Sequence, residues 1–206
     1  TFYRLMAEYG SAPRALEALP DIARAAGADR YTPFPADRAR QELSAGRAMG
    51  ARPLFSGAAD YPAGLREIAD APPFLWALGD TGLLRRPLVA LVGARNASSL
   101  GLRMARRLAG ELAEAGVVVV SGLARGIDTA AHEAALQGGT IAVQAGGIDI
   151  VYPAENAALM GRIGEQGLRL AEQPLGMEPL ARHFPMRNRL ISGLSMAVVV
   201  VEAAAN

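Results

Sequence analysis

Short apolar runs alternate with amphipathic stretches along the chain from about residue 87 onward. The apolar runs occupy residues 88–92, 117–120, 140–143, 168–171 and 197–201. Continuous runs of this length are typical of strands buried on both faces of a parallel sheet. The stretches between them have apolar residues at helical spacing, at residues 99–115, 127–137, 156–166 and 187–194. This alternation predicts right-handed βαβ units and an α/β fold with a doubly wound, mostly parallel sheet over residues 87–206.

The first fifty residues follow a different pattern, which predicts a small all-helical domain over residues 1–50. A first helix is expected to end at Gly10 and a second at Pro20, followed by a short turn over residues 21–26. A longer helix is predicted over residues 36–49. Short helices joined by glycine turns resemble SAM-like and helix-hairpin-helix modules, some of which hold nucleic-acid backbones. The pattern alone favours a helical bundle without a ligand.

Residues 51–86 are rich in proline and contain the only tryptophan, Trp76. Proline at this density favours extended and turning backbone. Several large apolar residues in the segment need burial. They are Leu65, Ile68, Phe74, Leu75 and Leu78. We therefore expect a junction that packs on the larger domain.

Composition narrows the possible classes of protein. A chain of 206 residues with 51% hydrophobic residues can bury one sizeable core and a small appendage. No apolar run has the length of a membrane span, and the absence of cysteine excludes disulfides, thiolate nucleophiles and cysteine zinc sites. The chain begins at Thr1 without a methionine, so we expect the natural start to lie upstream. We expect a cytoplasmic protein that has no contact with a membrane.

The basic residues carry more information than the net charge of +1. All 21 of them are arginine, which excludes a Schiff-base lysine and a P-loop lysine. Arginine stays protonated and binds phosphate through a planar fork, so it suits binding better than proton transfer. With two histidines in the whole chain, catalytic bases are scarce.

A first loop of possible chemical importance, residues 93–98, joins a predicted strand to a predicted helix. Gly93 allows a tight exit from the strand, and Arg95 and Asn96 can reach an anion. Ser98 can cap the helix or donate to a phosphate. Taken alone, this loop is better explained as a capped helix with a surface arginine.

A second loop follows four consecutive valines. It contains Ser121, Gly122, Arg125 and Gly126. Its glycines let a ligand approach the backbone, and free N–H groups at a helix start favour an anion. Asp128 would repel a phosphate, so we expect it to complement the helix N-terminus or to bind loop amides. Ser121, Asp128 and His132 could be imagined as a triad, but nothing marks Ser121 as a nucleophile, and we expect no catalytic residue.

The third loop, residues 184–189, is dense in hydrogen-bond donors. Arg187, Asn188 and Arg189 precede a helix and a core strand. One of the two arginines is expected to brace the fold by pairing with a carboxylate such as Glu202. The three loops together predict a surface that holds several phosphates in a row, without a metal or a cofactor. Phe184 and Tyr152 are the nearby aromatic residues, so backbone contacts should outweigh base stacking.

The three loops, in this order, resemble the DNA-processing protein A family (DprA, also called Smf). The family motifs are G-x-R-x-x-S/T, S-G-x-A-x-G-I-D-x-x-A-H and F-P-x-R-N-R-x-I-S-G-L-S, which stand here at residues 93–98, 121–132 and 184–195. The resemblance covers residues 60–203 closely and the helical N-terminal part loosely. The chain departs from the family at Gln144-Ala145, where a Leu-Gly pair is common. It also ends at Asn206, before the family's usual further helix and strand, so we expect the C-terminal end to be truncated.

The resemblance implies an extended Rossmann-like domain that binds single-stranded DNA and has no known catalytic activity. It further implies that the protein brings the recombinase RecA onto incoming single strands in natural transformation, displaces single-strand-binding protein, and acts as a homodimer. Arg95, Arg187, Asn188 and Arg189 match DNA-contacting positions of the family. The positions that match its phosphate-cradling loops are Ser98, Ser121, Gly122 and Gly126.

Two other interpretations stay open. Phosphoribohydrolases of the LOG type share a related fold, but they carry a P-G-G-x-G-T-x-x-E loop, whereas this chain has A-G-G-I-D at residues 145–149 and no matching glutamate. The fingerprint of a dinucleotide-dependent oxidoreductase is absent. An interaction module with a vestigial phosphate site is the other alternative, and substitution of Arg95 would distinguish it.

Overall fold

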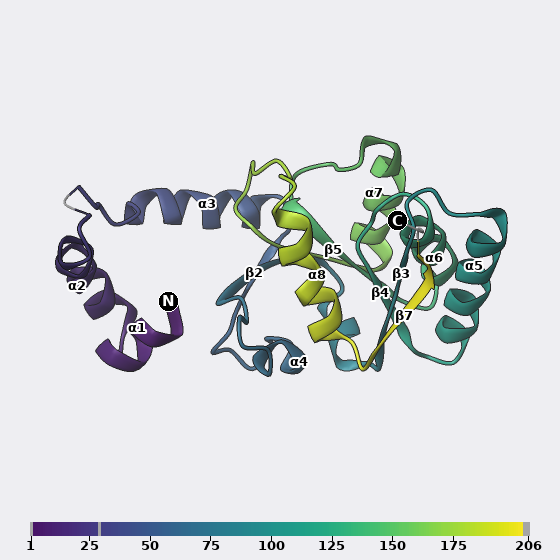
Figure 1. Cartoon of the computed structure of the whole chain (residues 1–206), viewed down its shortest axis with the longest axis horizontal. Coiled ribbons are helices and arrows are strands. Elements are labelled where there is room, and N and C mark those ends of the chain that lie inside the picture. The colour runs from purple at the N-terminus through teal and green to yellow at the C-terminus, as the bar shows by residue number, and fades with distance from the viewer. Residues whose placement is uncertain (1, 29, 204–206) are drawn as a thin grey trace. The chain divides into compact units, whose positions relative to one another are not determined.

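The structure, a computed structural model, describes residues 2–28 and 30–203, and the chain divides into two compact units, Thr1–Ser44 and Ala45–Asn206 (Figure 1). The smaller unit contains α1 (Phe2–Tyr9), α2 (Ala12–Ala25) and the start of α3 (Ala36–Ala48). Gly10, with φ of +73°, reverses the chain between α1 and α2. The unit boundary falls inside α3, a few residues before the boundary expected from the sequence.

The prediction that a helix ends at Pro20 is wrong, because α2 continues through this proline to Ala25. A proline removes one backbone donor from a helix, which is a local cost. The inward side of α2 extends past it through Ala15, Leu19 and Ile22, which are buried or half-buried. Burial of this continuous apolar stripe outweighs the missing hydrogen bond.

The larger unit is built on a seven-stranded sheet with the order β1-β2-β6-β5-β4-β3-β7. The strands are β1 (Arg52–Phe55), β2 (Phe74–Gly79), β3 (Leu88–Gly93), β4 (Val118–Ser121), β5 (Thr140–Gly147), β6 (Leu168–Gln173) and β7 (Ala197–Glu202). Neighbouring strands from β6 to β7 in this order are parallel, whereas β1 and β2 are antiparallel. The predicted α/β class, with its mostly parallel sheet and its helical N-terminal part, is confirmed.

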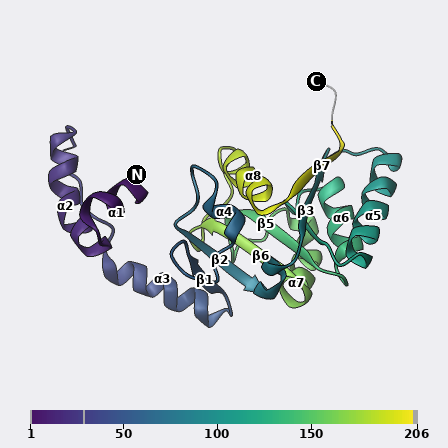
Figure 2. The ribbon, with the colours of Figure 1, turned by 90° about the horizontal axis from the view of Figure 1, so that it is seen from below.

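Helices cover both faces of this sheet (Figures 1 and 2). One face carries α5 (Ser99–Glu114), α6 (Ile127–Ala135) and α7 (Ala157–Gln166), and the other carries α4 (Ala63–Arg66) and α8 (His183–Leu194). Two short 3-10 helices, η1 (Thr81–Arg85) and η2 (Ala154–Asn156), lie in the connections. Successive valines of β4 point to opposite faces, so Val118 and Val120 join the core under α8 while Val119 packs under α5 and α6.

The proline-rich segment, expected to be a junction, supplies the two antiparallel strands β1 and β2. Pro53 is tolerated because β1 is an edge strand, where a missing backbone donor breaks no essential pairing. Leu75 and Trp76 of β2 are fully buried, and the Trp76 ring packs on Gly46, where a Cβ would collide with it. Burial of these apolar side chains stabilises the pairing of this segment with the rest of the sheet.

Two element boundaries near the expected site also differ from the sequence prediction. Strand β5 continues to Gly147 rather than ending at residue 143, and α8 begins at His183 rather than Arg187. Pro185 lies in the first turn of α8, where its missing N–H is no loss. The earlier start places Phe184 on the helix itself. Within the described residues, every helix is too short or too polar to cross a membrane.

Candidate nucleic-acid interface

The loops that follow β3, β4 and β5 meet the first turn of α8 at the carboxyl edge of the parallel strands, as the sequence predicted for the three motif loops. The loop after β3 docks on the start of α6. The N–H of Ile127 donates to Ala94 O at 3.2 Å. Gly126 has φ of +76°, and a Cβ there would lie 2.6 Å from Arg95 O, so this contact requires glycine. The backbone beneath Arg95 is therefore fixed.

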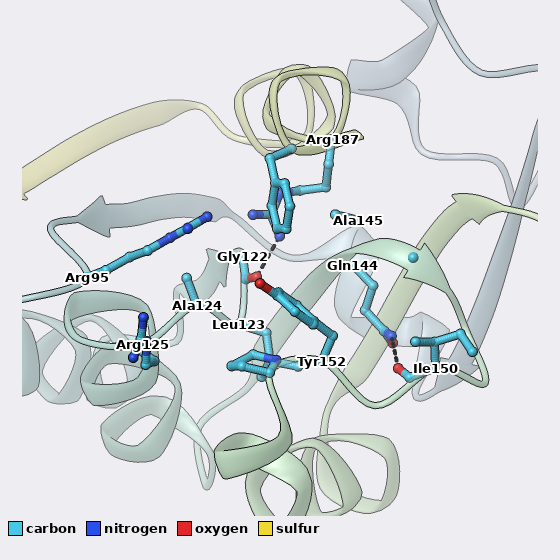
Figure 3. A pocket seen from close by; sticks show the side chains of 13 residues that line it. Arg95, Gly122, Leu123, Ala124, Arg125, Gln144, Ala145, Ile150, Tyr152 and Arg187 are labelled. Atoms are coloured by element: carbon cyan, nitrogen blue, oxygen red, sulfur yellow. Dashed lines mark hydrogen bonds between the residues drawn. The ribbon is translucent and has the colours of Figure 1, made fainter. Parts of the chain in front are cut away.

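Two hollows open at this edge, and Arg95 lines both. The smaller one, about 40 Å³, is bounded by the side chains of Arg95, Arg125, Tyr152, Phe184 and Arg187, together with the backbone after β4 (Figure 3). The larger one, about 480 Å³, extends from Arg95 along α8 past Asn188 and Ser192. Arg95 extends toward Arg187 and Gly122 across the smaller hollow, and Arg125 stands beside it (Figure 3).

An exposed cation and two aromatic rings form the outer wall of the smaller hollow. The guanidinium carbon of Arg95 lies 5.1 Å from the centroid of the Phe184 ring. The Phe184 and Tyr152 ring centroids are 5.7 Å apart with an interplanar angle of 54°. Tyr152 is 45% exposed and Arg95 is exposed. The Arg95 guanidinium can bind a phosphate, and the exposed Tyr152 ring beside the half-buried Phe184 ring offers a face for stacking.

Arg187 occupies a different position, because it is 6% exposed. Its guanidinium donates to Gly122 O at 2.5 Å and to Val143 O, and its Nε donates to Asn188 Oδ1 at 3.1 Å. A Cβ on Gly122 would lie 2.6 Å from this guanidinium, so glycine is required there. Burial lowers the pKa of Arg187 to about 10, opposed by the charge of Asp128, so the group stays protonated at neutral pH. Arg187 braces the floor of the hollow and adds positive charge to it from below.

Asp128 binds loop amides, one of the two roles that the sequence left open. Its carboxylate accepts from Gly122 N at 3.1 Å and from Ala124 N at 3.3 Å. Burial raises the pKa of this carboxyl, and the neighbouring Arg187 opposes the rise. These contacts hold Leu123 at φ of +58°. The N–H groups of Gly122 and Ala124 are thus directed inward rather than toward a ligand.

Ser121 is fully buried, and its hydroxyl donates to Leu91 O at 2.6 Å. The expectation that Ser121 cradles a phosphate is corrected, because its polar atoms face the protein interior. His132 contacts Thr140 Oγ1 at 2.7 Å through Nδ1 and is also fully buried. Ser121, Asp128 and His132 therefore form no triad.

The expectation that one of the two arginines pairs with a carboxylate is met by Arg189, but the suggested partner, Glu202, is wrong. Arg189 pairs with Asp70 at 3.1 Å and with Glu172 at 2.5 Å, not with Glu202. Glu202 instead accepts from the Ser98 hydroxyl at 2.6 Å and from Ser98 N at 2.9 Å, and these hydrogen bonds lower the pKa of the Glu202 carboxyl. Ser98 Oγ also accepts from Gly101 N at 3.0 Å and caps α5. A carboxylate this close disfavours a phosphate at Ser98.

Besides Ser98, four of the sequence-predicted residues keep exposed side chains at this edge: Arg95, Asn96, Arg125 and Asn188. Arg125 forms an ion pair with Glu155 at 3.3 Å, and both side chains are more than half exposed, so the pair is weak. Gly93 and Gly126 shape the backbone. The other exposed donors lie near Arg95. The buried Arg187 and Asp128 hold the loop after β4 in place through hydrogen bonds.

Sequence reasoning missed a buried polar pair behind the smaller hollow. Gln144 Oε1 accepts from Arg169 Nε at 2.9 Å, and Gln144 Nε2 donates to Gly147 O at 3.2 Å and Ile150 O at 3.1 Å. Arg169 also donates to Ile148 O, and burial lowers the pKa of Arg169 to about 10. The pair holds the loop that leads to Tyr152. Its signal in the sequence is a polar residue between apolar neighbours in each strand, Gln144 between Val143 and Ala145 and Arg169 between Leu168 and Leu170.

Comparison with known proteins agrees with this architecture. A family model described as DNA recombination-mediator protein A matches residues 52–206, and one described as DprA-like N-terminal HHH domain matches residues 1–45. The DNA processing protein DprA of Streptococcus pneumoniae is 49% identical over 154 residues, which are 73% of this chain and 54% of that protein. The Bacillus subtilis DprA is 40% identical over 163 residues, 78% of this chain and 55% of that protein. The chain thus spans about half the length of these curated relatives.

A solved structure of DNA processing protein A from Helicobacter pylori, described for its single-stranded DNA binding mode, has a TM-score of 0.71. It is 34% identical and covers 76% of this chain and 71% of its own. The X-ray structure of DprA from S. pneumoniae has a TM-score of 0.70 at 36% identity, over 90% of this chain and 72% of that one. With its sheet order, its Arg95 loop and a family model that matches most of its length, the chain belongs to the DNA recombination-mediator protein A (DprA) family.

Proposed function

We propose that this chain binds single-stranded DNA, chiefly through the phosphate backbone, at the surface formed by Arg95, Arg125, Tyr152 and Phe184. The observation that carries the proposal is the exposed Arg95 guanidinium beside the Phe184 ring, above a hollow that also contains Arg125 and Arg187. Phosphates favour the arginines, and unpaired bases favour the rings. The relative from H. pylori, described for its single-stranded DNA binding mode, supports the choice of single-stranded DNA as the ligand.

The preference for single strands follows from the two rings. A base can stack on Tyr152 or Phe184 when its face is free, which is so in a single strand but not inside a duplex. Stacking is sequence-tolerant because every base has a π-face. We therefore expect little dependence on base sequence and a strong dependence on salt.

The rival hydrolase has less support at this edge. Asp149, the acidic residue of the loop after β5, accepts from Gly176 N at 3.0 Å through one oxygen and at 2.9 Å through the other. Ser121 and His132 are buried and bonded within the fold. Because all three side chains are engaged in hydrogen bonds within the protein, no nucleophile lies next to a general base at the hollow among the described residues. We propose a binding protein without catalytic activity of its own.

The finer role that we propose is delivery of the strand to RecA during natural transformation, with displacement of single-strand-binding protein and action as a homodimer. This part rests on family membership alone. RecA assembly on strands coated with single-strand-binding protein, measured with and without this protein in its full-length form, tests it. No change in the rate of assembly would contradict delivery.

Binding itself is tested with labelled oligonucleotides, single-stranded beside duplex, at two salt concentrations and with AMP and NAD as competitors. We expect tight, salt-sensitive binding that prefers the single strand and is unaffected by either nucleotide. Binding of AMP or NAD without affinity for oligonucleotides would overturn the proposal in favour of a nucleotide-processing enzyme.

A further inference from the structure

A third hollow, a groove of about 400 Å³, lies on the other side of the Arg95 loop, between α5 and α6. Arg95, Arg106 and Arg125 line it from three different elements, and Asn96 adds an exposed amide. Arg95 also lines both hollows beside Phe184, so all three meet at this one side chain. A chain that passes over Arg95 therefore has an open path into the groove.

The charge of the groove favours an anion. Among the described residues that line it are three arginines and one carboxylate, Glu133, and only Arg125 has a carboxylate partner, the exposed Glu155 at 3.3 Å. Arg106 is exposed, and no carboxylate of the described chain lies within 4.0 Å of it. Its neighbour Arg107 is different, because its Nε is paired with Glu111 Oε1 at 2.7 Å along α5. Within the described residues, Arg106 is thus an unpaired cation that lines the groove, and Arg107 is an ion-paired arginine on the same helix.

The other residues that line the groove indicate which part of a nucleic acid it would bind. Its apolar members, Ala97, Leu102 and Ala130, are aliphatic, and no aromatic ring is present among the described lining residues. Thr129 and Asn156 are bonded to each other, with Asn156 Nδ2 donating to Thr129 Oγ1 at 2.9 Å. Without a stacking surface, the groove suits phosphodiester groups rather than bases.

We propose that the α5–α6 groove binds the backbone of the same single strand beyond the nucleotides held at Arg95 and Phe184, with Arg106 as its principal phosphate ligand. This inference rests on the proposed function, since it extends the same binding surface. A strand long enough to reach both regions gains the Arg106 contact, and a short one does not. The contribution of Arg106 therefore depends on oligonucleotide length.

The test compares Arg106→Ala with Arg107→Ala on single strands of about 5 and about 15 nucleotides, lengths within the range that small binding domains occupy. We expect Arg106→Ala to weaken binding of the longer strand about fivefold and to make its salt slope shallower by about 0.7, with no change for the shorter strand. Arg107→Ala should leave both unchanged. A third variant, Glu133→Gln, removes the opposing carboxylate and should tighten binding of the longer strand, a gain that a purely structural role would not produce.

Each other outcome has a definite meaning. Equal effects of Arg106→Ala and Arg107→Ala, or equal loss on short and long strands, would overturn the proposal. If Arg95→Ala weakens binding and Arg106→Ala does not, the groove proposal fails and the proposed function stands, whereas no effect of Arg95→Ala at either length overturns both. A labelled oligo-aspartate peptide tests the competing occupant. Peptide binding that is lost in Arg106→Ala, with unchanged binding of the longer strand, would assign the groove to an acidic peptide instead.

Discussion

The guanidinium carbon of Arg95 lies 5.1 Å from the centroid of the Phe184 ring, although the two residues come from motifs at opposite ends of the parallel sheet's sequence. The loop after β3 supplies the cation, and the first turn of α8 supplies the ring. The contact exists because β3 and α8 meet at the carboxyl edge of the sheet. It places a cation that is able to bind phosphate beside a ring that is able to stack on a base.

Replacing Arg95 with alanine removes the exposed cation shared by the hollows. We expect weaker binding of single-stranded oligonucleotides of every sequence and a salt slope shallower by about 0.7, because one phosphate contact is lost. Arg95→Lys should restore part of the slope but not the planar contact with Phe184. Titrations at several salt concentrations measure both effects. Unchanged affinity and slope in Arg95→Ala would favour a vestigial site.

Replacing Phe184 with alanine tests stacking separately from charge. We expect a loss of about 1–3 kcal/mol in binding free energy with an unchanged salt slope, because a stacking surface is removed and no charge is altered. Phe55→Ala is the control, since Phe55 is an exposed ring that contacts a second aromatic ring, that of Phe74, but lies on edge strand β1. A shallower slope in Phe184→Ala would mean that the ring acts through the position of Arg95.

Arg187 should act on folding more than on DNA contact. Arg187→Met leaves Gly122 O and Val143 O without their donor and Asp128 as a buried carboxyl without its cation. We expect a loss of about 3–5 kcal/mol in the free energy of unfolding, measured by denaturant titration. Loss of DNA binding with full stability would contradict this and return Arg187 to the role of a direct phosphate ligand.

The Gln144–Arg169 pair should behave as one unit. Gln144→Leu leaves Arg169 Nε and the carbonyls of Gly147 and Ile150 unpaired, which should cost about 1–3 kcal/mol of stability. Because Arg169→Leu disrupts the same network, the double variant should lose less than the sum of the two single losses. Denaturant midpoints of the four proteins measure the coupling, and additive losses would show that the two side chains act independently.

His132 should make the fold sensitive to acid. Thr140 Oγ1 donates its proton to Val119 O at 2.9 Å, so His132 Nδ1 must be the donor in their 2.7 Å contact. Burial, aided by the charge of Arg187, lowers the pKa of His132 to about 3. In the unfolded chain this histidine takes up a proton below about pH 6.5, which the folded state does not. Its contribution to stability is therefore complete above about pH 6.5 and falls by about 1.4 kcal/mol per pH unit toward pH 3.

The matched variant for this prediction is His132→Gln, whose amide can still donate to Thr140. The raised pKa of Asp128 acts in the opposite direction, since a carboxyl that binds its proton more readily in the folded state adds stability as the pH falls. Comparing the variant with the unaltered protein isolates the histidine. Denaturant midpoints at pH 7 and pH 5 should converge in His132→Gln. An equal loss of stability in both proteins would contradict the assignment.

Sequence patterns by themselves determined the alternation of strands and helices over residues 87–206 and the meeting of three polar loops at one edge. The reason is geometric, because parallel strands in a βαβ series all end at the same edge of the sheet. They also predicted that Arg95 can reach an anion, and the structure shows its side chain exposed. The LOG-type and oxidoreductase alternatives were already disfavoured by the absence of their loops.

Only the tertiary structure decided which donors face outward. Arg95 and Arg187 are the same residue type in similar motifs, yet Arg95 is exposed and Arg187 is buried. Arg187 is buried because the carbonyls that accept its hydrogen bonds come from β5 and from the loop after β4. Ser98 meets Glu202 across 104 residues of sequence. Local spacing encodes the periodicity of an element, whereas burial and pairing depend on residues that are far apart in the chain, and these become neighbours only when the sheet is assembled.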